Sequence, residues 1–224
     1  MRVFLLAMIV MSAEVTFGQD WPNLSKFKEA NDTLGAPAKG ENRVVFMGNS
    51  ITEGWKDHHP EFFANKSFIN RGIGGQTTPQ MLIRFRQDVV NLKPGVVVIL
   101  AGTNDIAGNT GPSTLDMIYD NIVSMAEIAQ ANGIKVIISS VLPAFDYPWR
   151  PGLDPATKIP ALNKMLSGYA TENGLTYLDY FSAMTDGNNG LRKELTYDGV
   201  HPNRAGYEVM ASLALKAIDQ VLSR

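Results

Sequence analysis

The chain alternates between segments whose apolar pattern suits strands and segments whose pattern suits helices. Apolar, β-branched runs predict five strands, at Arg43–Met47, Lys66–Asn70, Val96–Ala101, Lys135–Val141 and Thr176–Tyr180. Helical periodicity predicts helices before, between and after them, at about Trp21–Leu34, Thr78–Asn91, Ser113–Asn132, Thr157–Asn173 and Asn203–Leu222. Strands such as VVVILA are apolar throughout, which is typical of a parallel sheet covered on both faces. The pattern predicts an α/β fold, a three-layer α/β/α sandwich with about five parallel strands.

The first 18 residues do not fit this alternation. Arg2 precedes an apolar run from Val3 to Met11, and small residues follow as far as Gly18. This order is typical of a secretory signal peptide, and the run is too short to anchor a protein in a membrane. We predict a signal peptide at residues 1–18, export to the periplasm or the medium, and a single domain over residues 19–224. An N-terminal core helix is the alternative.

Composition narrows the classes of function. The 224 residues carry a net charge of −2, which provides no basic field for nucleic acid. The chain has no cysteine, so disulfides, thiolate metal sites and cysteine nucleophiles are excluded. We expect a small-molecule or polysaccharide partner rather than a nucleic acid or a membrane.

Candidate chemistry gathers where the predicted strands end, which is where open parallel sheets bind ligands. The first strand runs into Gly48, Asn49 and Ser50. A serine hydroxyl needs a base to act as a nucleophile. His201 with Asp198 three residues earlier could supply that base and its orienting carboxylate. A helix cap at Asp198 and a surface histidine at His201 explain the same residues equally well.

Donors for an oxyanion are also available at these strand ends. The glycines of GIGGQTT could turn a backbone N–H inward, and Asn104 could offer its side-chain amide. A tight turn and a loop cap are the structural alternatives. The segment from Gly72 to Thr77 lacks the third glycine of GxGxxG, and no GxxxxGK[ST] motif occurs. His58 and His59 lie in a polar stretch that predicts an exposed turn, so we expect no metal and no cofactor.

Four blocks occur in chain order: GNS at Ser50, GIGGQTT at Gly75, GTND at Asn104, and DGVHP from Asp198 to His201. Together they resemble the SGNH hydrolase superfamily, which includes the GDSL esterases and lipases. The resemblance extends over about residues 43–222 and implies a flavodoxin-like α/β/α fold. It also implies that Ser50 is the nucleophile and His201 the base oriented by Asp198. The implied oxyanion hole comprises the N–H groups of Ser50 and Gly75 and the side chain of Asn104.

The blocks look particularly like those of platelet-activating-factor acetylhydrolases and of bacterial carbohydrate acetylesterases. The family usually has Asp where this chain has Asn49, although that position is not part of the triad. The resemblance therefore implies that the chemistry survives the substitution.

The segment Leu142–Pro155, LPAFDYPWRPGLDP, mixes aromatic and charged residues after the fourth strand. Aromatic faces beside charges suit a sugar better than a lipid tail. We predict that Tyr147, Trp149 and Arg150 contact the substrate, and that the enzyme removes acetyl groups from a carbohydrate. Three alternatives stay open at this stage: a lipase or lysophospholipase, a thioesterase, and an inactive carbohydrate-binding module. These aromatic residues could also simply fix the loop.

Overall fold

A single parallel sheet organises the described part of the chain. The computed structural model describes residues 19–64 and 67–223, so the predicted signal peptide lies outside the described residues. The strands are β1 (Val44–Gly48), β2 (Phe68–Gly72), β3 (Val96–Leu100), β4 (Lys135–Ser139) and β5 (Thr176–Leu178). They pair in the order β2-β1-β3-β4-β5, and every pairing is parallel.

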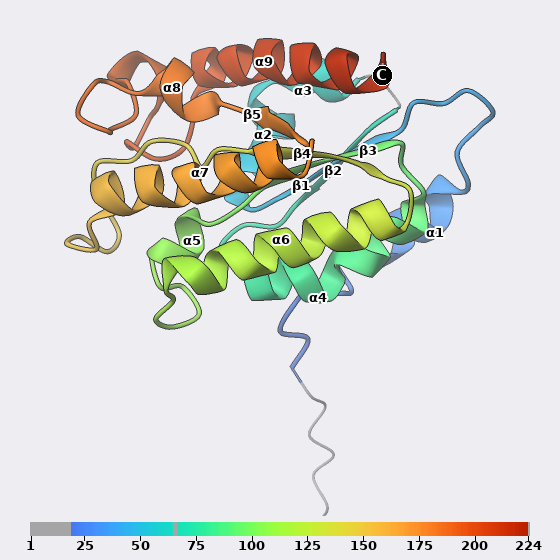
Figure 1. Cartoon of the computed structure of the whole chain (residues 1–224), viewed down its shortest axis with the longest axis horizontal. Helices are drawn as coiled ribbons and strands as arrows, with labels where there is room; N and C mark the ends of the chain where they lie inside the picture. Colours follow the sequence, from blue (N-terminus) through green and yellow to red (C-terminus); the bar gives the residue numbers. More distant parts are fainter. Residues whose placement is uncertain (1–18, 65–66, 224) are drawn as a thin grey trace, which may run out of the picture.

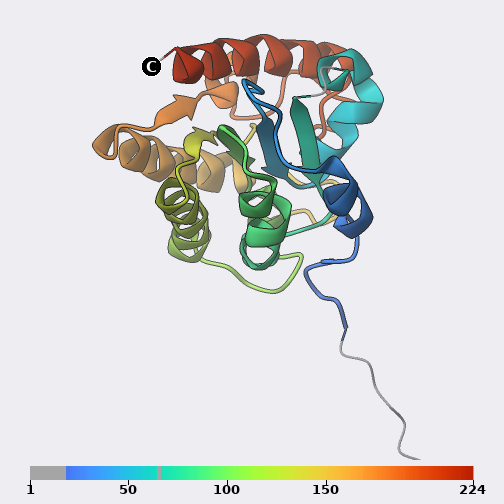
Figure 2. The same ribbon diagram turned by 90° about the vertical axis from the view of Figure 1, so that its right-hand side faces the viewer.

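Helices cover both faces of this sheet. They are α1 (Lys28–Leu34), α2 (Ser50–His58), α3 (Pro60–Phe63), α4 (Thr78–Asp88), α5 (Thr103–Ile106), α6 (Leu115–Ala131), α7 (Pro155–Glu172), α8 (Tyr180–Met184) and α9 (Arg204–Leu222). Two short 3₁₀ turns occur as well, at Val90–Leu92 and Lys193–Leu195. Figure 1 shows α9 on one side of the sheet and α4 and α6 on the other, and Figure 2 shows the same layers after a 90° turn.

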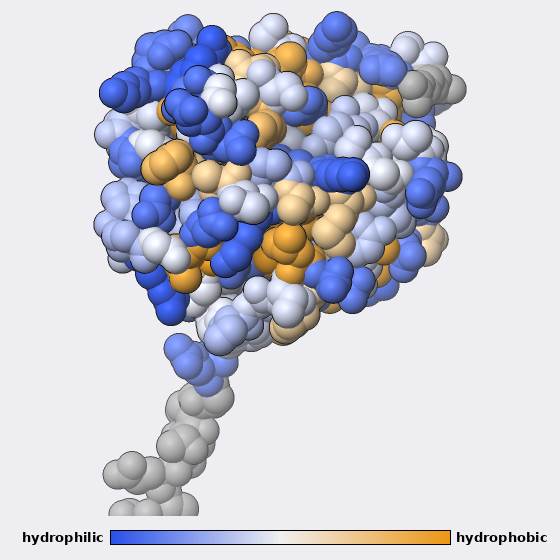
Figure 3. Space-filling model, turned by 60° about the vertical axis from the view of Figure 1, so that its left-hand side comes forward, coloured by the Kyte–Doolittle hydropathy of each residue, from blue (hydrophilic) through white to orange (hydrophobic). Residues whose placement is uncertain are grey.

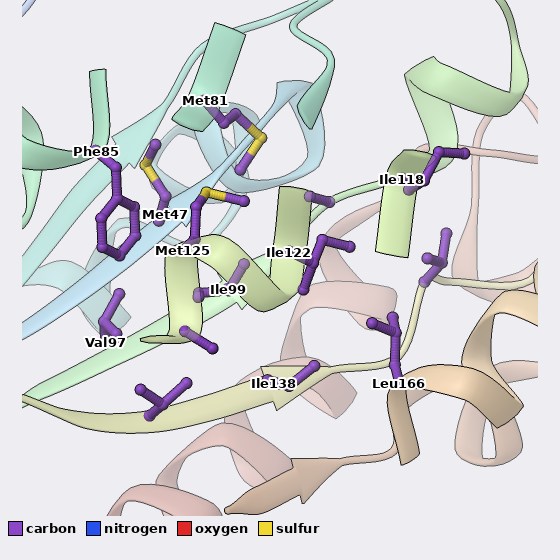
Figure 4. Close-up of a cluster of buried hydrophobic side chains, with 14 of the residues drawn as sticks. Met47, Met81, Phe85, Val97, Ile99, Ile118, Ile122, Met125, Ile138 and Leu166 are labelled. Atoms are coloured by element: carbon purple, nitrogen blue, oxygen red, sulfur yellow. The ribbon is translucent and has the colours of Figure 1, made fainter. Parts of the chain in front are cut away.

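Alternation along the strands divides the core into two parts. Val45 and Met47 of β1 lie in a cluster with apolar side chains of α4, α6 and α7. Their neighbours Val44 and Phe46 lie in a second cluster with α2, α3, α8 and α9. Successive residues of a strand point to opposite faces, so a strand buried on both sides must be apolar throughout. Figure 4 shows the first cluster, in which Met47 lies near Met81 and Met125.

The strand order creates a site between β1 and β3. The chain leaves β1 toward β2 on one side and later returns to β3 on the other. Ligands bind at such a reversal, outside the carboxyl ends of the strands. Ser50 follows β1 after a single intervening residue, and Asn104 lies in the short helix that follows β3. The topology thus brings two separate sequence blocks to one edge of the sheet.

The predicted fold class is confirmed: the chain has an α/β fold with a five-stranded parallel sheet flanked by helices. Each strand begins and ends within about two residues of its predicted limits. Helix α2 and the short helices α3, α5 and α8 are not among the predicted helices. A four- or five-residue helix is too short to establish a recognisable period.

Residues 21–27 differ most from the prediction, since they form turns and helix α1 begins only at Lys28. The carboxylate of Asp20 accepts two backbone N–H groups of this segment, and Asn23 has a φ of 56°. Carbonyl groups of the segment accept hydrogen bonds from glutamine side chains within residues 76–87. These tertiary bonds replace helical ones.

Across residues 19–64 and 67–223, no helix has both the length and the apolar character needed to cross a membrane.

Candidate active site

Ser50 begins helix α2 immediately after strand β1. The preceding residue, Asn49, is buried and caps the helix, because its side-chain oxygen accepts the N–H of Ile51 at 3.3 Å. An uncharged asparagine therefore performs the capping that an aspartate could perform here. The cap fixes the first turn of α2, and the half-buried Ser50 lies at the carboxyl edge of the sheet.

Asp198 and His201 share a tight loop just before helix α9. The Oδ1 atom of Asp198 accepts the backbone N–H groups of Val200 and His201, at 2.9 and 2.7 Å. Thr196 closes the loop, since its hydroxyl donates to the carbonyl of His201 at 2.6 Å. These bonds hold the carboxylate beside the imidazole ring, where Oδ2 of Asp198 lies 2.7 Å from Nδ1 of His201.

The same imidazole contacts the serine. Nε2 of His201 lies 2.9 Å from Oγ of Ser50, although the two residues are 151 positions apart. An ionised carboxylate can only accept a hydrogen bond, so Nδ1 of a neutral His201 carries its proton. Nε2 is then free to accept the proton of the Ser50 hydroxyl. The structure thus brings Ser50, His201 and Asp198 into one hydrogen-bonded chain.

Asp198 is ionised in this arrangement. Burial acts to raise the pKa of its carboxyl, but hydrogen bonds from the backbone and ring of His201 and from Val200 outweigh that effect. The pKa of Asp198 therefore lies below its ordinary value. A carboxylate that stays charged beside Nδ1 also stabilises the imidazolium that forms when His201 accepts a proton.

The loop after β2 supplies a free backbone donor. Gly75 has a φ of 75°, a conformation that strains any residue with a Cβ, and a Cβ at this position would point into open space. The N–H of the neighbouring Gly74 is occupied, because it donates to Glu53 at 2.7 Å. Among the described residues no partner is found for the N–H of Gly75. This difference favours Gly75 over Gly74 as the oxyanion donor.

Asn104 lies in helix α5, which follows β3. This strand pairs with β1 on the side opposite β2. The side chain of Asn104 is buried, and Nδ2 donates one hydrogen to the carbonyl of Gln76 at 2.9 Å. That bond fixes the plane of the amide and leaves a second hydrogen for another acceptor. The amide also joins the Gly75 loop to the end of β3.

Two buried charged side chains, neither of which was predicted, hold these loops together. Arg84 has no exposed surface; it donates to the carbonyls of Gly48 and Arg71, at 3.0 and 2.9 Å, and to the side chain of Gln76 at 2.6 Å. It thereby connects the ends of β1 and β2 to the Gly75 loop.

Asp105, in the short helix α5 after β3, also holds two loops together. Its carboxylate accepts the N–H of Thr78 at 2.9 Å and the hydroxyl of the same residue at 2.6 Å, which caps helix α4. Burial, which outweighs these hydrogen bonds, raises the pKa of Asp105 to about 6. A carboxyl group thus titrates close to neutral pH directly beside Asn104.

The loop after β4 reaches the triad through Trp149. The Trp149 ring is 46% exposed, and its centroid lies 5.7 Å from that of His201. Tyr147 is completely buried and its hydroxyl donates to the carbonyl of Thr103 at 3.0 Å, so the prediction that Tyr147 contacts substrate is wrong. Its ring stacks under Trp149 at 5.3 Å and supports it.

Arg150, the third residue predicted to contact substrate, fixes a loop. Its Nη1 donates to the carbonyls of Ala107 and Gly108, at 3.0 and 2.7 Å. The side chain stays exposed, so contact with a substrate through its remaining nitrogens stays a prediction.

Tyr197 is a neighbour of the triad that the sequence analysis missed. It is 62% exposed, and its ring lies almost parallel to that of His201 at 5.9 Å. Its position directly before Asp198 was the one available signal. The face of the molecule turned forward in Figure 3 carries several separate apolar patches among polar residues, rather than one continuous apolar surface.

The paired histidines are not members of the triad, although the ring of His58 lies 5.9 Å from that of Tyr197. His58 ends helix α2 and is exposed, whereas His59 is half-buried and contacts Glu61 at 3.0 Å, so they do not form a simple exposed turn. No group of three His, Asp or Glu side chains able to hold a metal ion occurs in residues 19–64 and 67–223.

Comparison with known proteins bears on these residues. A model of the GDSL-like lipase/acylhydrolase family matches residues 46–209, which contain Ser50, Gly75, Asn104, Asp198 and His201. The chain belongs to this family. The predicted resemblance to the SGNH and GDSL hydrolases is therefore confirmed, and the protein is a GDSL-type acylhydrolase.

Solved and curated relatives agree with the assignment. This acylhydrolase is 50% identical to a Bacteroides fragilis protein assigned to the acylhydrolases, with a TM-score of 0.89 and coverage of 92% of this chain and 100% of the other. It is 26% identical to the esterase TesA of Pseudomonas aeruginosa over 73% of this chain and 77% of that protein. It is 32% identical to the rat platelet-activating factor acetylhydrolase IB subunit alpha2 over 48% of this chain.

The acylhydrolase spans about half the length of several curated relatives. It matches 47% of the rat subunit, and 54% of an uncharacterized lipoprotein of Bacillus subtilis to which it is 30% identical over 51% of this chain.

Proposed function

We propose that the protein is a secreted serine esterase that removes short acyl groups, chiefly acetyl, from carbohydrate hydroxyls. The observation that carries the proposal is the hydrogen-bonded chain from Ser50 through His201 to Asp198, with distances of 2.9 and 2.7 Å. Export rests on the predicted signal peptide at residues 1–18.

The reaction follows from the positions of these atoms. Nε2 of His201 accepts the hydroxyl proton while Oγ of Ser50 forms a bond to the ester carbonyl carbon. The carbonyl oxygen becomes an oxyanion that accepts hydrogen bonds from the N–H groups of Ser50 and Gly75 and from the free amide hydrogen of Asn104. The ester C–O bond then breaks, and His201 returns the proton to the leaving alcohol.

Water completes the cycle by the same route. His201 removes a proton from a water molecule that attacks the acyl group on Ser50, and the second oxyanion occupies the same donors. The Ser50 oxygen leaves with the proton from His201, which releases the carboxylic acid. No component beyond these side chains and water is required for atoms and charge to balance.

Features around Ser50 support a small acyl group on a polar substrate. The position of a Gly75 Cβ faces open space, so there is room beside this donor. Exposed aromatic rings beside His201, those of Trp149 and Tyr197, could lie against the C–H faces of a sugar. The relationship to esterase and acetylhydrolase proteins is in accord with this chemistry.

The proposal is tested with p-nitrophenyl esters and two serine variants. Ser50→Ala should abolish acetate release, whereas Ser182→Ala, an exposed serine on α8, should keep the wild-type rate. A series from acetyl to octanoyl esters should show the highest kcat/KM for acetyl. Wild-type activity in Ser50→Ala would remove the serine mechanism, and a preference for octanoyl would favour a lipase or thioesterase.

Export is tested separately, because the N-terminal sequence of the exported protein should begin at Gln19.

A further inference from the structure

The direction in which the alcohol leaves can be deduced from the triad. His201 gives its proton to the leaving oxygen, so the alcohol must lie next to Nε2 of His201. Trp149 and Tyr197 have their rings 5.7 and 5.9 Å from the His201 ring, and both are exposed. An alcohol that takes its proton from Nε2 of His201 therefore lies close to these two rings.

A groove continues outward from Tyr197. It has a volume of about 630 Å³, within the range of small-molecule ligand sites. Residues 145–148 and Pro151 line one part of it, and residues between 186 and 199, including Asp198 itself, line another. Trp149 lies outside this lining, so Tyr197 is the residue that joins the groove to the rings beside His201. Phe145, which is 66% exposed, and Tyr197 contribute aromatic surface to it.

Gly190 brings the two lining segments into close contact. A Cβ on this residue would lie 2.8 Å from Oδ2 of Asp186 and 3.2 Å from Cβ of Phe145. Only a glycine permits this approach without a shift of its neighbours. Oδ1 of Asp186 accepts the N–H groups of Asn188 and Gly190, at 2.8 and 3.0 Å, which fixes the carboxylate in the same groove that Phe145 lines.

The polar groups of the groove differ in their bonding. Both oxygens of Asp146 accept backbone N–H groups. In contrast, Oδ2 of Asp186 and Nζ of Lys193 have no hydrogen-bond partner within the described chain. An alkyl chain laid over these two charged groups would remove water from them without replacing its hydrogen bonds, which costs free energy. A sugar presents C–H faces to aromatic rings and hydroxyls to a carboxylate or an ammonium group.

We propose that this groove, which we name the Phe145–Tyr197 groove, binds the saccharide chain of the leaving alcohol. The inference rests on the proposed function and extends it, because it assigns the carbohydrate to a particular surface beyond the triad. The sugar unit that carries the ester lies against Trp149 and Tyr197, and the next units follow the groove past Phe145 and Asp186.

Two variants test the groove against a matched control. Phe145→Ala removes the exposed ring, and Asp186→Asn changes the free acceptor while its turn can still form. Met117→Ala, which truncates a 53% exposed side chain on α6, is the control. The kcat/KM of each purified, folded variant is measured on p-nitrophenyl acetate, on p-nitrophenyl octanoate, and on chemically acetylated oligosaccharides from xylan, mannan and pectin.

For an oligosaccharide that the wild type deacetylates, we expect kcat/KM to fall about tenfold in each groove variant, a difference of about 1.4 kcal/mol. With p-nitrophenyl acetate, whose leaving group is too short to extend past Tyr197 to Phe145 and Asp186, kcat/KM should fall less than about twofold, as in Met117→Ala.

If oligosaccharides are deacetylated but the variants match the control, the role of the groove is overturned while the proposed function stands. If Phe145→Ala affects only the octanoyl ester, the groove binds an apolar chain and the inference is wrong. If p-nitrophenyl acetate is hydrolysed but no acetylated oligosaccharide is, the carbohydrate function itself fails.

Discussion

Replacement of Asn104 by alanine separates its role in catalysis from its role in the fold. The side chain has two amide hydrogens: one donates to the carbonyl of Gln76 at 2.9 Å, and the other is free for the oxyanion. Alanine removes both. Loss of one oxyanion donor costs about 10²–10³ in kcat, or about 2.7–4 kcal/mol of transition-state stabilisation. The Gln76 carbonyl, left without this donor in a buried environment, costs about 1–3 kcal/mol of unfolding free energy.

The chain offers a close control in Asn163. It is also buried, and it exchanges two hydrogen bonds with the backbone of Val141, at 2.8 and 3.0 Å, without bonding to any residue of the triad or the oxyanion hole. Asn163→Ala should therefore lower the free energy of unfolding by at least as much as Asn104→Ala while kcat stays close to that of the wild type.

Steady-state hydrolysis of p-nitrophenyl acetate and urea denaturation of both variants give the two quantities. We expect kcat to fall in Asn104→Ala alone, with KM little changed, because the donor acts on a charge that exists only in the transition state. Wild-type kcat in folded Asn104→Ala would remove this residue from the oxyanion hole. An equal fall of kcat in both variants would assign the effect to general loosening of the fold.

Further predictions concern the carboxylates and the buried tyrosine. Asp198→Asn should lower kcat about 10⁴-fold on p-nitrophenyl acetate, since an amide does not hold the His201 tautomer; a fall below tenfold would contradict this. The folded pKa of Asp105, about 6, exceeds the ordinary 3.8, so lowering the pH from 7 to 4 should stabilise the wild type by about 2.4 kcal/mol relative to Asp105→Asn in urea denaturation. Parallel curves for the two proteins would exclude a raised pKa. Tyr147→Phe should lower the unfolding free energy by about 1–3 kcal/mol through loss of its bonds to Thr103, with kcat nearly unchanged; a selective fall in kcat would restore a role in catalysis.

The sheet and the triad were predictable because their signals are local or depend on general topology. Continuous apolar runs identify parallel strands, and such strands collect their following residues at one edge. That rule alone places Ser50 near Asn104. The pairing of Asp198 with His201 was readable from a three-residue spacing.

The role of each aromatic residue in YPW was not predictable in the same way. Tyr147 and Trp149 are two positions apart and of similar character, yet one is fully buried and the other half-exposed. A hydrogen bond to Thr103, 44 positions away, decides which ring lies inside. Nothing in the local sequence encodes that contact.

Contacts between distant segments also explain three features that the sequence left open: the choice of Gly75 over Gly74, the burial of Arg84, and the role of Asn49. Glu53 accepts the N–H of Gly74, 21 positions later, and so leaves Gly75 as the free donor. Arg84 reads as an ordinary helix residue, but its guanidinium is buried beneath the ends of β1 and β2. Asn49, a departure from the family pattern, is explained once its amide is seen to cap α2.

Covalent labelling can show whether Ser50 is the nucleophile. Folded protein is treated with a fluorophosphonate, and intact mass followed by peptide mapping locates the adduct. If Ser50 is the nucleophile, we expect one adduct per chain, on Ser50, with none in Ser50→Ala and slow labelling in His201→Ala. An adduct on another residue, or no adduct on protein that hydrolyses p-nitrophenyl acetate, would contradict it.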